Sequence, residues 1–361
     1  MRILNLKQLN DNILSNFTIK TINPSEISDW NTEILRLNNY SFFHSLEWAL
    51  VLSDTYKYKP VYFCLFKNNI LSSVVPAMEI KSKLTGKRLV SLPFSDFCEP
   101  LFNSIEESEI LKEKIFEYCE NNLLKFMEFR TSETRFPFET GQFRTDLRHI
   151  LNLVPDENEL KKNLSDNTKR NIKTAIKEGI IIKEENSEAA LKTFYKLQCI
   201  TRKKHGLPPQ PESFFDNIYK HILSQSKGTM FFASLNGKPI ASLMFFTFGE
   251  KVLYKFGASL NQNLPKGANH LLMWEAIKKY SLLGFKEFDF GRTEINHEGL
   301  RRYKLGFGAD ERLIFTTRYD IRTKSFIPPE TKTTGIHNKI FERLPLTVLK
   351  IIGNALYKYM G

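Results

Sequence analysis

The sequence predicts an α/β protein made of two tandem copies of one sheet-and-helix unit, followed by a C-terminal amphipathic helix. Three observations support this fold. Residues 228–290 read as three strands, a helix and a further strand; residues 60–130 read in the same order; and two stretches align between these regions without gaps. A chain of 361 residues has room for two domains of ordinary size. We therefore expect a twisted mixed sheet flanked by helices in each half.

The second half carries the clearer pattern. A short apolar run is followed by Asn236-Gly237, the two-residue turn typical of a β-hairpin, and then by a return strand rich in Phe, Leu and Met. Apolar positions at helical spacing predict a later helix, and Gly284 suits its C-terminal end. The expected elements are strands at 231–234, 240–248, 252–257 and 285–290, and a helix at 269–283.

The first half repeats this order. Residues 63–74 align with 232–243, and residues 118–131 align with 280–293. Matches this short arise by chance, but two in the same order argue for duplication of one unit. The expected boundaries are an N-terminal domain at 1–147, a C-terminal domain at 148–322 and a tail at 323–361.

Composition limits the class of protein. The net charge of +12 favours anionic partners such as nucleic acid, nucleotide-linked substrates or an acidic membrane surface, with a solvated lysine-rich surface as the alternative. The four cysteines lack the spacing of zinc ligands, so we expect no metal site. The sequence has neither a signal-peptide pattern at Met1 nor an apolar run long enough to cross a bilayer, which predicts a cytoplasmic protein.

The tail predicts a basic amphipathic helix from Lys339 to Tyr359. An apolar stripe runs through this segment, with basic residues between the apolar ones. Such a helix either packs on its own protein, the interpretation we favour, or lies on the anionic inner surface of a membrane. The basic residues are Lys339, Arg343, Lys350 and Lys358.

The stretch from Asp289 to Gly308 has the densest set of residues that could carry chemistry. It begins at the end of a predicted strand, where α/β proteins place their sites. An acid or His297 could act as a general base, and Lys304 could neutralise an oxyanion or a phosphate. A structural ion pair between Asp289 and Arg292 is the alternative. Six such residues lie within sixteen positions: Asp289, Arg292, Glu294, His297, Arg301 and Lys304.

The loop before the predicted helix at 269–283 is a candidate donor-binding site. A glycine and a small residue precede a helix N-terminus, an arrangement that suits a phosphate, although an ordinary strand-to-helix turn would look the same. The residues of this candidate site are Lys266, Gly267, Ala268 and Asn269.

A basic run and a loop aspartate are further candidates. Lys169, Arg170 and Lys173 lie on a predicted helix at 166–178, where they would suit a diphosphate or a tRNA backbone; a solvated basic face is the alternative. Asp96 follows a predicted strand in the first half and could bind an amine, unless it is only a turn residue.

Four stretches stand in the order of the motifs of one family. They are Ser45-Leu-Glu-Trp48, Leu92-Pro-Phe-Ser-Asp96, Thr168-Lys-Arg-Asn-Ile-Lys-Thr-Ala175 with Gly179, and Asp289-Phe-Gly-Arg292 with Tyr303-Lys-Leu-Gly-Phe-Gly308. The chain thereby resembles the FemAB-like peptidyltransferases, which are twin-GNAT enzymes associated with peptidoglycan interpeptide bridges and related envelope acyl transfers. The resemblance covers most of residues 40–320.

The resemblance implies a transferase that moves an aminoacyl or acetyl group onto an amine of a cell-envelope precursor, either peptidoglycan-type or linked to a lipid or nucleotide. It implies aminoacyl-tRNA or acyl-CoA as co-substrate, with no permanently bound cofactor. It also implies that Lys304 and the pair Lys169 and Arg170 contact phosphates or assist transfer, and that Asp96 lines the acceptor site. We assign catalysis to Lys304, Asp289 and Asp96, and substrate binding to Trp48, Lys169, Arg170, Lys173, Tyr254, Arg292 and Tyr303.

Two departures from the family keep alternatives open. Lys169 stands where the family helix has arginine, and the chain lacks the coiled-coil arm that tRNA-using members insert. One alternative is therefore an acyl-CoA-dependent N-acetyltransferase of a small molecule or surface sugar. A second alternative is a non-catalytic scaffold that binds polyanions such as RNA or a membrane.

Overall fold

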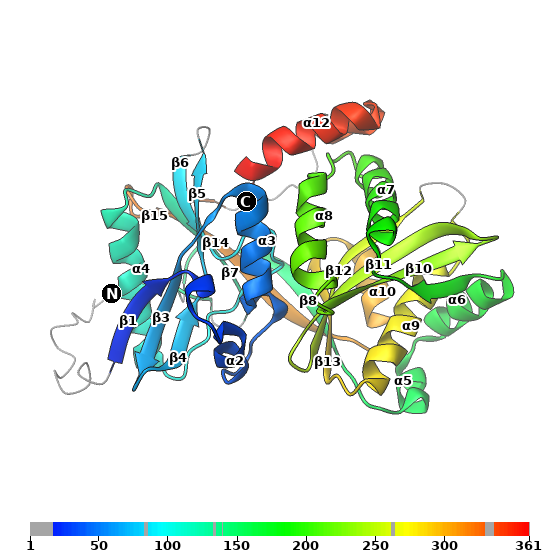
Figure 1. Ribbon diagram of the computed structural model, residues 1–361, viewed down its shortest axis with the longest axis horizontal. Coiled ribbons are helices and arrows are strands. Elements are labelled where there is room, and N and C mark those ends of the chain that lie inside the picture. The colour runs from blue at the N-terminus through cyan, green and yellow to red at the C-terminus, as the bar shows by residue number, and fades with distance from the viewer. Residues whose placement is uncertain are drawn as a thin grey trace. The chain divides into compact units, whose positions relative to one another are not determined.

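We analysed a computed structural model of the protein (Figure 1). It describes residues 17–82, 86–132, 135–138, 140–260, 264–328 and 336–360. The chain forms two compact units. Unit 1 takes the residues up to Arg144 and the segment Ile314–Pro329, and unit 2 takes Thr145–Leu313 and the tail Glu330–Met360.

Unit 1 contains two sheets. A three-stranded antiparallel sheet has the order β1 (Phe17–Ile22), β3 (Tyr62–Lys67), β4 (Ile70–Val75). The second has the order β2 (Lys59–Pro60), β5 (Met78–Ser82), β6 (Gly86–Val90), β7 (Phe126–Thr131), β14 (Asp310–Asp320), with β15 (Ser325–Phe326) beside β14. The helices are η2 (Pro24–Glu26), α2 (Trp30–Leu35), η3 (Phe42–His44), α3 (Leu46–Tyr56) and α4 (Ile105–Asn121).

Unit 2 is built on one mixed sheet with helices on both faces. Its strand order is β8 (Arg144–Asn152), β13 (Glu287–Glu294), β12 (Lys251–Ser259), β11 (Lys238–Phe248), β10 (Gly228–Leu235), β9 (Ile181–Glu184). α7 (Glu188–Lys204) and α8 (Glu212–Ile218) cover one face, while α6 (Asp166–Lys177) and α9 (Ala268–Leu282) cover the other (Figure 1). The remaining helices are α5 (Glu157–Asn163), the π-helical η4 (Tyr219–Leu223) and α10 (Glu298–Leu305).

The duplication predicted from the sequence is confirmed. Unit 1 has the element order β3, β4, β5, β6, α4, β7, and its strands β6 and β7 are parallel. Unit 2 has the element order β10, β11, β12, α9, β13, and its strands β12 and β13 are parallel. In both units the helix between the parallel strands packs on the sheet, as a parallel crossover requires.

The strand after each repeat belongs to the other unit. β8 follows β7 in the chain but pairs with β13, and β14 follows β13 but pairs with β7. The units therefore differ from the expected domains, because residues from Ile314 join unit 1 while the tail joins unit 2. Hydrophobic periodicity predicts that a segment is a strand, but it does not say which partner the strand takes.

Several elements differ from the sequence prediction. β1 and α10 were not expected, and the predicted single tail helix is two helices, α11 (Ile336–Arg343) and α12 (Leu346–Leu356), followed by η5 (Tyr357–Tyr359). Pro345 separates them, because proline lacks the amide hydrogen needed inside a helix but fits just before a first turn. Among the described residues, no helix has the length and apolar character needed to cross a membrane.

A buried carboxylate joins β7 to β14 in unit 1. The Glu128 side chain accepts hydrogen bonds from Arg130 on its own strand and from Arg318 on β14. Burial raises the pKa of Glu128, but the two guanidinium groups outweigh this effect and lower it from about 4.5 to about 2. The charged form of Glu128 is therefore the form that stabilises this strand pair.

We predict that this ion pair makes unit 1 sensitive to acid. Because the pKa of Glu128 is lower in the folded state, its contribution is complete above about pH 4.5 and is lost as the pH falls toward 2. In Glu128→Gln, the free energy of unfolding should fall by roughly 3 kcal/mol at neutral pH and should depend less on pH below 4.5. Urea unfolding at several pH values measures both. The exposed Glu117→Gln is the control; an equal loss there would contradict the assignment.

Candidate functional site

The parallel strands β12 and β13 of unit 2 part after three residue pairs. Their pairing runs from Lys251 with Glu287 to Leu253 with Asp289 and then stops. Beyond that point residues 254–259 of β12 pair with β11, and residues 292–294 of β13 pair with β8. We call this interruption, between residues 254–259 and 290–294, the splay. It lies at the carboxyl ends of two parallel strands, where α/β folds place their sites.

A bulge in each strand marks the start of the splay. In β12, Tyr254 pairs with Phe245 and Phe256 pairs with Met244, so Lys255 is an extra residue. The extra residue reverses the alternation of the strand: the Tyr254 ring packs on Phe245 in the core under α9, whereas Phe256 packs on Phe214 and Phe215 of α8.

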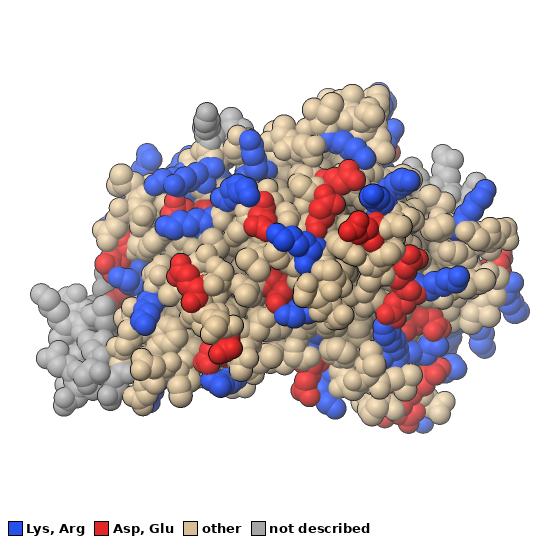
Figure 2. Space-filling model, viewed as in Figure 1, with Lys and Arg blue, Asp and Glu red and all other residues tan. Residues whose placement is uncertain are grey.

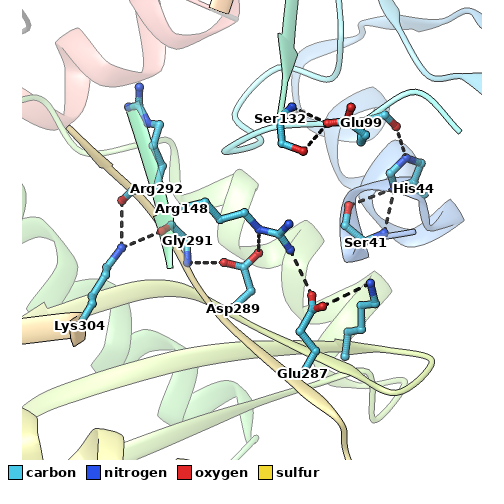
Figure 3. A network of polar contacts seen from close by, with 11 residues as sticks. Ser41, His44, Glu99, Ser132, Arg148, Glu287, Asp289, Gly291, Arg292 and Lys304 are labelled. Atoms are coloured by element: carbon cyan, nitrogen blue, oxygen red, sulfur yellow. Dashed lines mark hydrogen bonds and ion pairs between the residues drawn. The ribbon is translucent and has the colours of Figure 1, made fainter. Parts of the chain in front are cut away.

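The bulge in β13 is held by charged side chains. His149 of β8 stands opposite both Phe290 and Gly291, and Gly291 has a φ of 69°, which favours glycine. The Asp289 carboxylate accepts the Gly291 N–H at 2.7 Å and pairs with Arg148 Nε at 2.8 Å (Figure 3). These contacts fix the backbone conformation at the point where β13 leaves β12.

Lys304 reaches the same bulge from α10. Its side chain is buried, and its Nζ donates to the carbonyl oxygens of Gly291 at 2.7 Å and Arg292 at 3.1 Å (Figure 3). The alternative ion pair of Asp289 with Arg292 does not form: Asp289 binds Arg148, and Arg292, which is exposed, binds Asp146 at 3.0 Å. Lys304 and Asp289 thus share one backbone segment of the site and determine its shape.

The N-terminus of α9 lies at the same end of the strands and has no side-chain cap. Gly267, the residue before the helix, has a φ of 87°, and no acidic residue stands in the first turn. A Cβ at Gly267 would lie 2.0 Å from the Asn171 carbonyl oxygen, so only glycine allows α9 to pack this closely on α6. The Ala268 N–H donates to the Pro265 carbonyl oxygen, and no side chain caps the rest of the first turn. The helix dipole therefore makes this end a candidate site for an anion.

Polar side chains surround this helix end. The Tyr303 hydroxyl donates to the Asn269 carbonyl oxygen at 3.0 Å, and the His270 ring lies 4.9 Å from the Tyr303 ring. Asn171, which is 6% exposed, has its Nδ2 atom 3.4 Å from His270 Nε2, while its buried Oδ1 atom has no hydrogen-bond partner among the described residues. A buried oxygen of this kind ordinarily has a partner.

Burial also affects how these groups ionise. It raises the pKa of both Tyr303 and Tyr254, so both hydroxyls keep their protons at neutral pH and remain hydrogen-bond donors. Burial lowers the pKa of His270, so its ring stays neutral. The Tyr254 hydroxyl lies over Gly257, where a Cβ would approach it to 2.1 Å. The anion site therefore has neutral hydrogen-bonding groups beside it.

The equivalent place in unit 1 is closed. β6 and β7 also pair over three residues, but the chain after β6 continues to bond to β7: Ser91 N–H donates to the Glu128 carbonyl and Cys98 N–H to the Arg130 carbonyl. The N-terminus of α4 is capped by the Ser104 side chain and has two glutamates in its first turn. Negative charge and a filled cap exclude a phosphate there, so unit 2 alone offers this site among the described residues.

The structure shows the surroundings of the other residues predicted for the site. Lys169, Arg170 and Lys173 project from α6, where Arg170 and Lys173 are exposed and Lys169 is partly so. Trp48 is fully buried in unit 1, with its ring 5.5 Å from the Phe43 ring, which fits a core residue. Asp96, also in unit 1, is half-buried.

The first motif in unit 1 has a local structural role. Ser45 caps α3 through the Trp48 N–H, and His44 beside it is fixed by the Ser41 N–H and by the Glu99 carbonyl oxygen, at 3.0 and 2.7 Å (Figure 3). Such contacts set the entry of a buried helix.

Sequence reasoning missed Asn171, His270 and His149. Asn171 stands inside the basic motif and His270 directly follows the donor loop, so proximity to those motifs was the available signal. His149 lies 3.1 Å from Glu311 and 3.5 Å from the Thr293 hydroxyl. Burial, then the charge of Lys304, lowers the pKa of His149 from 6.5 to about 4, so the buried ring is neutral at physiological pH.

Comparison with known proteins supports the architecture. Residues 162–310 match the family described as the acetyltransferase (GNAT) domain, a span that lies within unit 2 and contains the splay. No protein of curated function matches the sequence.

Solved structures of similar fold cover most of the chain. FemX is similar over 82% of this chain and 96% of its own, with a TM-score of 0.63 and 15% identity. L-PGS from Bacillus licheniformis is similar over 90% and 96%, with a TM-score of 0.53 and 12% identity. A tandem GNAT protein from the clavulanic acid biosynthesis pathway is similar over 84% and 98%, with a TM-score of 0.52 and 6% identity. The protein has a tandem GNAT fold.

We predict that Lys304 shapes the site through the β13 bulge. Lys304→Met keeps the length of the side chain but leaves two buried carbonyl oxygens without their donor, so the free energy of unfolding should fall by roughly 1–3 kcal/mol. Urea unfolding measures this, with the exposed Lys177→Met as the matched control. An unchanged stability in Lys304→Met, combined with lost turnover, would contradict the positioning role and favour direct catalysis.

Proposed function

We propose that the protein is an acyltransferase whose donor binds in unit 2, with its phosphates at the N-terminus of α9 and its acyl group at the splay. The observation that carries this proposal is the uncapped first turn of α9 beside the parted strands β12 and β13. The match to a GNAT acetyltransferase domain over this part of the chain supports it.

The shape of the splay fits an extended acyl donor. Beyond Leu253 and Asp289, the facing edges of β12 and β13 do not pair with each other. Lys304 binds the Gly291 and Arg292 carbonyls and Thr201 binds both backbone groups of Ser259, so an entering chain would bond to the residues between them. A donor held there by its pantetheine-like or ribose-linked arm would direct its phosphates toward residues 267–269. Acyl-CoA is the donor that we favour, and aminoacyl-tRNA is the alternative.

In the reaction, the acceptor amine attacks the donor carbonyl carbon. A C–N bond forms, the bond from the carbonyl carbon to sulfur or oxygen breaks, and the leaving group takes up a proton. We assign this proton to the Tyr303 hydroxyl, which keeps it at neutral pH. The amine nitrogen releases one proton to water as the C–N bond forms, and water returns a proton to Tyr303. Lys304 and Asp289 act on the reaction by holding the β13 backbone.

For the acceptor we propose an amine on an anionic cell-envelope precursor. The net charge of +12 favours an anionic substrate, and the sequence motifs resemble those of envelope acyltransferases. The similarity in fold to FemX and L-PGS agrees with this class of acceptor.

We predict that Asn269→Asp weakens donor binding. A carboxylate in the first turn interacts favourably with the helix dipole, by ~0.3–1 kcal/mol, so the protein should not lose stability. The same carboxylate should repel the donor phosphates. Affinity for acetyl-CoA, measured by titration calorimetry, should fall about tenfold or more.

The control places the same charge on another helix of the same unit. Asn158→Asp, in the first turn of α5, should leave the affinity within about twofold. Parallel titrations with aminoacyl-tRNA identify the donor. If Asn269→Asp changed the affinity for neither donor, the phosphate site would lie elsewhere.

We predict that Tyr303→Phe slows the chemical step. Loss of a general acid lowers kcat by roughly 100-fold or more, whereas KM for the donor should change little. Tyr195→Phe is a matched control, because Tyr195 also donates its hydroxyl to a backbone carbonyl, that of Gln210, at 3.1 Å. Both variants should lose similar stability, and only Tyr303→Phe should lose turnover. Equal kcat values for the two variants would remove Tyr303 from the mechanism.

A further inference from the structure

The C-terminal helix α12 presents two apolar faces, and one of them packs on unit 2. Leu349, Gly353 and Tyr357 are spaced four residues apart and are buried. A Cβ at Gly353 would lie 2.0 Å from the Pro209 carbonyl oxygen, which shows how closely the helix approaches. This face confirms that the tail packs on its own protein, as the sequence analysis favoured.

Polar contacts fix the orientation of the helix. The Tyr357 hydroxyl accepts from Arg202 Nη2 at 2.6 Å and donates to the Pro208 carbonyl at 3.2 Å. Lys350 Nζ lies 4.8 Å from the centre of the Tyr195 ring. In α11, the Asn338 amide donates to the carbonyl of His205. These contacts fix the rotation of α12 about its axis, so its opposite face points away from unit 2.

That opposite face is exposed and carries an apolar stripe. Val348, Ile351 and Ala355 follow helical spacing on it, and Ile351 is 69% exposed, while the exposed Thr347, Asn354 and Lys358 lie beside the stripe. Beyond each end of α12, Ile340 and Met360 are more than half exposed. An apolar stripe that a packed helix turns away from its own core requires a separate explanation.

The charges around this stripe are almost all positive. Residues 336–360 contain four basic residues and a single acidic one, Glu342. Lys339, Arg343 and Lys358 are exposed. In Figure 2 the outer surface of α12 is mostly uncharged, with basic side chains at its borders. This pattern complements a surface that has an apolar interior and negatively charged groups at its boundary with water.

We propose that the outer face of α11 and α12 binds the surface of an anionic lipid bilayer, with the stripe of α12 among the acyl chains and the basic residues at the phosphate headgroups. α12 has 11 residues, about 16 Å in length, which is too short to span a bilayer but suits a helix that lies in its surface. The proposal stands apart from the acyl-transfer function, because it rests on the tail alone.

Sedimentation of the full-length protein with lipid vesicles tests the proposal. The wild-type protein should sediment with vesicles of mixed phosphatidylcholine and phosphatidylglycerol, and much less with phosphatidylcholine alone. Val348→Ser combined with Ile351→Ser should weaken binding about tenfold or more, because it removes the apolar contact. Replacing Lys339, Arg343 and Lys358 by Gln should weaken it about fivefold for each charge.

A matched variant tests whether the effect is specific to this face. Leu282→Ser combined with Leu283→Ser removes two equally exposed apolar residues from the end of α9 and should leave binding unchanged. Equal vesicle binding by the wild type and the Val348 and Ile351 variant would overturn the proposal. A dimer of the wild-type protein in the absence of lipid, measured by sedimentation equilibrium, would also overturn the proposal if the Val348 and Ile351 variant were monomeric. A second copy of the chain would then cover the stripe.

Discussion

The site depends on one backbone constraint: β12 and β13 separate while each remains bonded to its other neighbour. β12 stays paired with β11 as far as Ser259, and β13 stays paired with β8 as far as Glu294. Parting two strands exposes backbone groups that ordinarily bond to each other, and such groups must find another partner or water. A bulge in each strand allows the separation without breaking the rest of the sheet.

The two units share one pattern of strands and helix but differ at the place where the parallel strands end. In unit 2 the strands part and the following helix begins without a side-chain cap, which leaves the positive end of the helix dipole open to a ligand. In unit 1 the chain after β6 fills the equivalent place, and Ser104 caps α4. The two units share one framework, and the segments that follow β6 and β12 decide whether the place beside the parallel strands is closed or open.

Charged residues in motif positions hold the backbone in place here. Asp289 and Lys304 bind backbone groups around Gly291, and Arg148 secures Asp289 from β8. A buried charge is stable only when it is paired and hydrogen-bonded, and these residues satisfy that condition within the bulge. In the proposed reaction they would act by holding the strand in the geometry that the donor meets.

The sequence by itself determined the order of elements, the duplication, and the Gly267-Ala268 turn at the start of α9, because periodicity and turn residues are local signals. Only the tertiary structure decided that β8 and β14 pair in opposite units and that Trp48 and Lys304 are buried. It also decided that Asp289 binds Arg148, 141 positions away, and not the nearby Arg292. The reason is physical: strand partners and ion pairs are chosen by contacts between distant segments, and a local pattern of residue types does not encode their distances.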